Sequence, residues 1–282
     1  MSYIEVSFLP IPFEPWNEII VADLSELPFE SFMEEKSYLK AYIKKENFKA
    51  SDLQKCVSKW IKNVDLNLQF EVAEIAKQNW NQVWEEQFEP ISINNNLHLL
   101  APFHAKENYE GLIIEVEPKM SFGTGHHQTT FLMCEEISKL SLENKHVLDM
   151  GSGTGVLAIL AEKYGAKEIL AVDIEPWSVE NCAENTKRNK CKNVRSIKGD
   201  IDVIEKNKFD VIFANINKNV LLTHLPTYSK CLNHSGILLL SGFFETDIDQ
   251  LSLAAKNQNL IIMSSNNKDG WALLSFNKIV GF

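Results

Sequence analysis

The feature that most constrains the fold is an alternation of short apolar segments with amphipathic ones, from about Leu132 to the end of the 282-residue chain. Runs such as VIFA and ILLLS are apolar without a break, which is typical of strands buried on both faces of a largely parallel sheet. The loop 265–270 is too short for a parallel crossover, so the final strand should be antiparallel. Seven strands are predicted, at His146–Met150, Glu168–Ile174, Val194–Lys198, Phe209–Asn215, Gly236–Gly242, Leu260–Ser264 and Trp271–Asn277.

The N-terminal quarter has a different pattern, in which strands and helices follow the order β-α-β-β-α-β of a ferredoxin-like domain. We therefore expect three parts: a ferredoxin-like domain at 1–76, a helical linker at 77–96 and an α/β domain at 97–282, which opens with strands at Leu97–Phe103 and Leu112–Val116. The predicted elements of the first domain are Tyr3–Leu9, Trp16–Leu27, Phe29–Glu35, Tyr38–Lys45, Ser51–Ile61 and Leu66–Ile75.

Composition narrows the class of function. Hydrophobic residues make up 45% of the chain and charged residues 23%, as in ordinary globular proteins, and the formal net charge is -10. That balance argues against direct nucleic-acid binding and suits a small ligand or a basic protein partner. Residues 1–90 hold 16 acidic and 9 basic side chains, a net charge of -7. Either a solubilising surface or a docking face for a basic partner accounts for this concentration.

The five cysteines are widely spaced and form no C-x-x-C pair, so we expect neither disulfides nor a zinc or other metal site, and a reducing, cytoplasmic location. The start of the chain lacks the features of a signal peptide, and no apolar run approaches membrane-spanning length.

The segment HVLDMGSGTGVLAIL, residues 146–160, places a glycine-rich turn between a strand and a helix. Glycines such as Gly151 and Gly153 let the backbone turn sharply and approach a ligand, next to the unpaired N–H groups of a helix start. The spacing G-x-G-x-G differs from the dinucleotide pattern G-x-G-x-x-G. A nucleotide-dependent oxidoreductase fits less well, because the third glycine of that pattern, counted from Gly151, would fall on Val156.

Three polar residues lie at, or just after, the carboxyl ends of the next three predicted strands. Asp173 lies 22 residues after Gly151, where a carboxylate accepts both hydroxyls of a ribose; it could instead cap a helix. Asp200 offers an acceptor to the exocyclic amine of adenine, or caps a turn. Asn215 offers a donor and an acceptor to a cofactor or a reacting amine, or merely ends a strand.

One further segment, PKMSFGTGHHQTT at 118–130, is rich in small and hydroxyl residues. It is expected to fold over the ligand as a lid, although an ordinary flexible loop is the simpler alternative.

With a terminal antiparallel strand, these motifs resemble the seven-stranded, Rossmann-like fold of S-adenosylmethionine-dependent methyltransferases. The succession S-F-G-T-G-H-H-Q-T-T, L-D-M-G-S-G-T-G, V-D-I-E-P and A-N-I is similar, in order and spacing, to the PrmA family, which methylates ribosomal protein L-eleven (L11) of the large subunit. The resemblance implies S-adenosylmethionine as cofactor, lysine side chains and the N-terminal amine of L11 as acceptors, and an N-terminal domain that binds this basic substrate.

The resemblance also carries over individual residues. It implies cofactor contacts at Thr130, Gly151, Asp173 and Asn215. It places Phe122, Gly123 and His127 in the matching lid, and Asn215 and His127 are the candidates for handling the amine and its proton. The chain departs from the family at His126-His127-Gln128, at Ser152 and at Ile216-Asn217-Lys218. Two alternatives stay open: a methyltransferase acting on another protein, a nucleic acid or a small molecule, and a non-catalytic binding module.

Overall fold

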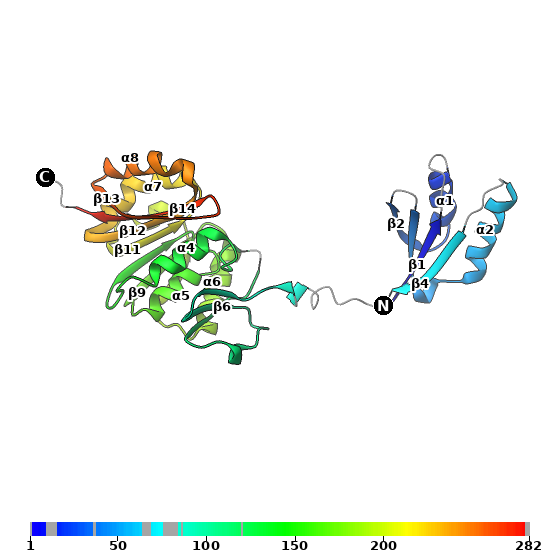
Figure 1. The fold of residues 1–282 in the computed structure, drawn as a ribbon, viewed down its shortest axis with the longest axis horizontal. Helices are drawn as coiled ribbons and strands as arrows, with labels where there is room; N and C mark the ends of the chain where they lie inside the picture. The colour runs from blue at the N-terminus through cyan, green and yellow to red at the C-terminus, as the bar shows by residue number, and fades with distance from the viewer. Residues whose placement is uncertain are drawn as a thin grey trace. The chain divides into compact units, whose positions relative to one another are not determined.

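A computed structural model describes residues 2–9, 16–35, 38–63, 69–75, 84–85, 87–119 and 121–279. The chain forms two compact units, Met1–Phe88 and Glu89–Phe282, which are described separately (Figure 1). Much of the expected helical linker at 77–96 lies outside the described residues. Its last part is not helical, because Ile91–Asn94 forms a strand that pairs with the next segment.

The first unit has a four-stranded sheet in the order β2-β3-β1-β4, and each neighbouring pair is antiparallel. Alternate residues of β1 are buried, among them Val6 and Phe8, and they pack with Leu24 and Trp60 from the two helices. The arrangement is ferredoxin-like, as the sequence predicts. Its elements are β1 (Tyr3–Leu9), α1 (Trp16–Ser25), β2 (Phe29–Glu35), β3 (Tyr38–Lys44), α2 (Ala50–Asn63) and β4 (Gln69–Ile75).

The second unit opens with a small sheet of three strands, β5 (Ile91–Asn94), β6 (Leu97–Leu100) and β7 (Leu112–Glu115). The sequence predicts only the last two. A seven-stranded sheet follows, in the order β10-β9-β8-β11-β12-β14-β13. Its strands are β8 (His146–Met150), β9 (Glu168–Asp173), β10 (Val194–Lys198), β11 (Phe209–Asn215), β12 (Leu232–Phe244), β13 (Leu260–Lys268) and β14 (Trp271–Lys278).

The last strand confirms the expectation drawn from its short connection. β14 lies between β12 and β13 and is antiparallel to both, whereas the neighbours from β10 to β12 run parallel. The chain leaves β8 toward β9 and β10 on one side, then returns to add β11 and β12 on the other. Strand order therefore reverses between β8 and β11, and their carboxyl ends form the edge where open α/β sheets bind ligands.

Both faces of this sheet are covered, which explains the unbroken apolar runs. Along β11, Val211 and Phe213 belong to one core, and Ile212 and Ala214 belong to the other. Figure 1 shows the two layers, with α4, α5 and α6 on one face and α7 and α8 on the other. These helices are α4 (Gln128–Ile137), α5 (Val156–Lys163), α6 (Pro176–Arg188), α7 (Lys218–Cys231) and α8 (Ile248–Lys256).

Candidate active site

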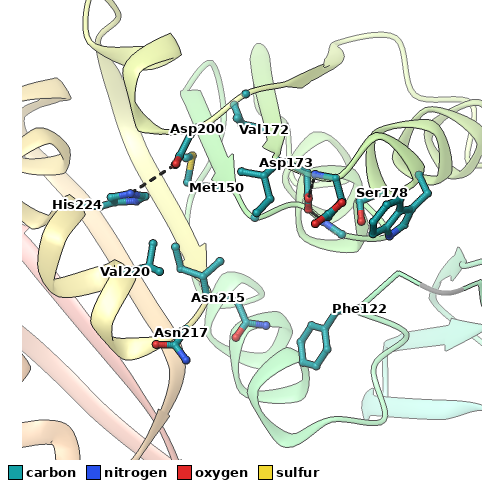
Figure 2. Close-up of a pocket in the computed structure, with 17 residues that line it drawn as sticks. Phe122, Met150, Val172, Asp173, Ser178, Asp200, Asn215, Asn217, Val220 and His224 are labelled. Carbon is teal, nitrogen blue, oxygen red and sulfur yellow. Dashed lines mark hydrogen bonds and ion pairs between the residues drawn. The ribbon is translucent and has the colours of Figure 1, made fainter.

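A cavity of about 480 Å³ lies at the carboxyl ends of β8, β9 and β11 (Figure 2). Its walls combine apolar side chains with a few polar groups, as is usual for a small-molecule site. Six of the residues chosen from sequence line it, and three do not, namely Gly123, His127 and Thr130. The lining residues are Phe122, Met150, Gly151, Gly153, Val172, Asp173, Ile174, Glu175, Trp177, Ser178, Gly199, Asp200, Asn215, Ile216, Asn217, Val220 and His224.

The glycine turn between β8 and α5 forms the floor of the cavity. Gly151 and Gly153 have φ angles of 77° and 52°, which other residues adopt only with strain. A Cβ on Gly151 would lie 2.2 Å from Cγ2 of Ile216, and a Cβ on Gly153 would lie 2.2 Å from the carbonyl oxygen of Phe122. Each of these positions therefore needs glycine for two reasons: the backbone angle, and the close approach of Ile216 or Phe122.

Asp173, at the end of β9, is held by two backbone N–H groups. Its Oδ2 accepts from the N–H of Gly153 at 2.9 Å, and its Oδ1 accepts from the N–H of Glu175 at 3.0 Å. Glu175 is the N-cap residue of α6. One carboxylate thus joins the glycine turn to the start of a helix and also lines the cavity, and its contact with a ribose stays a prediction.

Asn215 ends β11 and points into the cavity in Figure 2. Its Oδ1 is buried and finds no hydrogen-bond partner among the described residues. A buried amide oxygen without a donor costs free energy. An N–H or O–H donor on a bound ligand would satisfy it, so the site suits a nucleoside or an amine better than an apolar molecule.

Asp200 follows β10 and also has two roles. Its Oδ1 accepts from the N–H of Ile201 at 2.7 Å, which caps the short 3-10 helix Ile201–Ile204, and its side chain lines the cavity. Behind it lies His224 of α7, only 5% exposed. Its Nε2 is 3.5 Å from Oδ1 of Asp200, the contact drawn in Figure 2. Burial lowers the pKa of His224, and the negative charge of Asp200 offsets part of this effect by raising it.

The lid segment is tied to the glycine turn rather than free. Thr154 donates its N–H to the carbonyl of Phe122 at 2.9 Å and its hydroxyl to the carbonyl of Gly123 at 2.6 Å. Phe122 itself is 51% exposed and lines the cavity. Gly123 therefore positions the neighbouring aromatic ring through its backbone.

His127 is the N-cap of α4. Its Nδ1 accepts from the N–H of Thr129 at 3.3 Å and lies 2.8 Å from the Thr129 hydroxyl. Its ring packs edge-on against Phe122 and Trp271, at centroid distances of 5.0 and 4.6 Å. Burial lowers the pKa of His127. The neutral ring that accepts at Nδ1 carries its proton on Nε2. Thr130, next in the helix, is 1% exposed, and its hydroxyl has no partner among the described residues.

Sequence reasoning missed several lining residues, notably Trp177, Asn217 and His224. Trp177 could have been found from the sequence, because it follows Asp173 closely at the start of a helix. In the structure its side chain is 52% exposed. Asn217 could also have been found from the sequence, as an asparagine just before a helix. It caps α7 by accepting from the N–H of Asn219 at 2.9 Å. His224 had no signal in the sequence, since a histidine in the middle of an amphipathic helix gives no indication of which turn faces a cavity.

Asn185 of α6 and Asn189, which caps the end of that helix, hold the chain that leads into the lid. Asn185 accepts from the N–H of Glu117 at 2.9 Å and donates to the carbonyl of Thr154 at 2.9 Å. One turn later, Asn189 accepts from the N–H of Glu115 and donates to its carbonyl. These amides fix the lid approach and the glycine turn to the same helix.

Comparison with known proteins identifies the architecture. The sequence profile of the family described as "Ribosomal protein L11 methyltransferase (PrmA)" matches residues 18–279. The chain belongs to this family. A ribosomal protein L11 methyltransferase of Phocaeicola vulgatus is 36% identical over 282 residues, covering 98% of this chain and 99% of the relative. One from Porphyromonas gingivalis is 37% identical over 261 residues, covering 92% and 90%.

A solved member of the PrmA family has the same fold. The crystal structure of a ribosomal protein L11 methylase from Lactobacillus delbrueckii subsp. bulgaricus is 28% identical, with a TM-score of 0.63, and covers 68% of this chain and 100% of that one. The PrmA chain described here is accordingly a protein methyltransferase that uses S-adenosylmethionine. In the part of the chain that the structure describes, no helix is long and apolar enough to cross a bilayer.

Proposed function

We propose that this PrmA-family chain transfers methyl groups from S-adenosylmethionine to lysine side chains, and to the N-terminal amine, of ribosomal protein L11. The observation that carries the proposal is the cavity at the strand-order reversal, where Asp173, the glycine turn and the unpaired Oδ1 of Asn215 meet. Family membership supports the substrate, since the relatives are named for it.

The residues present fit the cofactor. Asp173 would accept the ribose hydroxyls, and Asp200 the exocyclic amine of adenine, with the apolar side chains of Ile174 and Val220 beside the base. The backbone at Gly151 and Gly153 lets the ligand lie against the turn. Gly123 lies behind the cavity wall, where its carbonyl holds the lid to the glycine turn. Thr130 does not line the cavity, and its contact with the cofactor rests on the family resemblance alone.

The sulfonium of the cofactor supplies a methyl carbon that is already activated, so the protein's main task is to orient a neutral amine and exclude water. Asn215 is the residue we assign to this orientation, because its buried Oδ1 can accept an N–H of the incoming amine. Burial of the target lysine lowers its pKa and favours the reactive neutral form. His127 positions Phe122, and with Nδ1 accepting at the helix start and its proton on Nε2, the ring has no free nitrogen to serve as a base.

The acidic first unit is the part we assign to substrate binding. A negative surface attracts a basic ribosomal protein and speeds encounter more than it tightens the complex. This assignment places the enzyme in the cytoplasm, with its substrate.

The test is a methyl-transfer assay with labelled S-adenosylmethionine and three separate acceptors: purified ribosomal protein L11, its variant with every lysine replaced by arginine, and ribosomal RNA. Label should enter the wild-type protein, should fall to the N-terminal amine alone in the arginine variant, and should not enter RNA. Labelling of RNA, or equal labelling of the two proteins, would contradict the proposal. The variant Asn215→Ala should retain cofactor binding within about tenfold and lose most of its turnover.

A further inference from the structure

A chain of three polar residues runs from the buried core to the cavity. Tyr228 and His224 lie one turn apart on α7, with exposures of 0% and 5%. The hydroxyl of Tyr228 is 3.2 Å from Nδ1 of His224, and the two rings are perpendicular, 5.7 Å between centroids. The other ring nitrogen, Nε2, faces Oδ1 of Asp200 at 3.5 Å. Two groups that would be costly to bury alone thus form a line that ends at a cavity wall.

The direction of the hydrogen bonds follows from what each group can do. A carboxylate only accepts, so Nε2 of His224 must carry the proton that faces Asp200. Burial lowers the pKa of His224 and raises that of Tyr228, so the ring is neutral and the phenol keeps its proton. In a neutral ring protonated on Nε2, Nδ1 accepts. The hydroxyl of Tyr228 therefore donates to Nδ1 of His224, and the protonated Nε2 faces Oδ1 of Asp200 at 3.5 Å.

This line restricts the carboxylate of Asp200. Its Oδ1 receives the N–H of Ile201 at 2.7 Å and faces Nε2 of His224. No donor from the described residues reaches Oδ2, although the side chain lines the cavity and is 58% exposed. The carboxylate is thus fixed on one oxygen and keeps the other for a donor on a ligand.

We propose that His224, supported by Tyr228, is a positioning residue that fixes Asp200 so that the cavity selects a purine with an amine at position 6. The proposal rests on the proposed cofactor site. A 6-oxo purine presents an acceptor where the 6-amino purine presents a donor, and an acceptor facing a fixed carboxylate is disfavoured. Without His224 the carboxylate can turn away, so the binding of the amine weakens and the rejection of the oxygen relaxes.

The experiment measures the dissociation constants of S-adenosylhomocysteine and its 6-oxo analogue, S-inosylhomocysteine, by titration calorimetry on the full chain. His224→Leu should weaken the adenosyl ligand about tenfold and narrow the preference over the inosyl ligand by a similar factor. His224→Gln keeps an N–H donor near the position of Nε2. It should restore most of the affinity for the adenosyl ligand and most of the preference over the inosyl ligand. Tyr228→Phe should have an affinity and a preference between those of His224→Leu and His224→Gln. In methyl transfer, His224→Leu should raise the KM for S-adenosylmethionine more than it lowers kcat.

The matched control is Ser229→Ala, on the same helix, which removes a buried hydroxyl that donates to the carbonyl of Gln258 and does not line the cavity. It should alter thermal stability and leave the ligand preference unchanged. An unchanged preference in His224→Leu, or an equal loss in His224→Gln, would overturn the inference. So would long-range ¹H–¹⁵N spectra showing the proton of His224 on Nδ1. If the wild type bound neither ligand, the cofactor site itself would be wrong, which is a separate result.

Discussion

Gly151 is subject to two constraints, a positive φ angle and a close approach of neighbouring atoms. Experiment can separate them, because Gly270 is subject only to the first. Both have positive φ angles, 77° and 82°. A Cβ at Gly151 would meet Ile216 at 2.2 Å, whereas a Cβ at Gly270 would meet nothing within 4 Å. The pair therefore distinguishes backbone strain from the loss of close approach.

We predict that Gly270→Ala lowers the free energy of unfolding by about 1 kcal/mol, the cost of the left-handed backbone for alanine. Gly151→Ala should cost more, and should weaken S-adenosylhomocysteine more than about tenfold, because Ile216 must move and reshape the cavity floor. Urea denaturation and calorimetry measure the two effects. Equal stability losses with intact binding in both variants would show that the contact at Gly151 is unimportant.

Asp149 is the residue whose charge should depend most on folding. It is fully buried below the glycine turn, and its Oδ2 accepts from the N–H of Ala158 at 3.1 Å. Burial raises the pKa of Asp149 to about 7, with a smaller contribution from the charge of Asp173. The folded protein thus holds a proton that the unfolded chain releases near pH 3.8.

Because the folded pKa is raised, the stabilisation from this proton is complete below about pH 4 and is lost as the pH rises to about 7. Asp149→Asn, which cannot ionise, should remove that part of the pH dependence. We predict that the difference in unfolding free energy between wild type and Asp149→Asn shifts in favour of the wild type when the pH falls from 7.5 to 5. Urea titrations at both pH values measure it, and a difference independent of pH would show that Asp149 is already ionised at pH 5.

At the scale of elements, α6 acts as a clamp on its neighbours. Asn185 bonds the N–H of Glu117 and the carbonyl of Thr154 with one side chain. Replacing it by Leu leaves both backbone groups unpaired in a buried place, and each such loss costs about 1–3 kcal/mol. We predict that Asn185→Leu lowers the unfolding free energy by about 2–4 kcal/mol and speeds hydrogen exchange at Glu117.

Lys187→Ala serves as the control for this helix, because Lys187 is exposed on α6. It should change stability by no more than about 0.5 kcal/mol and leave exchange at Glu117 as it was. A similar effect of both substitutions would mean that α6 is merely a weak helix and that Asn185 has no special role.

Two strands extend well beyond their predicted bounds, for identifiable reasons. β12 begins at Leu232 rather than Gly236, since the polar run Asn233–Ser235 looks like a loop but lies in a strand that contains a register shift. β13 extends to Lys268, so the turn into β14 is only Asp269-Gly270, with φ angles of 51° and 82°. An Asp-Gly pair between two strands is a strong hairpin signal. The polar residues at the end of β13 look like a loop, so sequence reasoning missed this hairpin turn.

At the scale of the whole molecule, each unit has a core of its own. One hydrophobic cluster lies within the first unit and two lie within the second, which also contains every residue that lines the cavity. We therefore expect cofactor binding to need only the second unit, and we propose that the acidic first unit binds the protein substrate.

We predict that deletion of residues 1–88 leaves the affinity for S-adenosylhomocysteine within about threefold of wild type and lowers methylation of L11 at least about a hundredfold. Calorimetry and the labelling assay measure the two, and adding the separate first unit in trans is the control for a lost docking contact. Full turnover of L11 by the truncated enzyme would contradict a substrate-binding role for the first unit.

The sequence by itself determined the parallel sheet, the antiparallel last strand, the glycine turn and the polar residues after β9, β10 and β11. These follow from local chemistry, because apolar runs, glycines and strand ends are written in contiguous residues. The tertiary structure alone decided that His224 and Trp177 reach the cavity and that Gly123, His127 and Thr130 lie outside its lining. Which turn of a helix faces a site depends on how that helix packs against the sheet, and packing joins residues far apart in the chain.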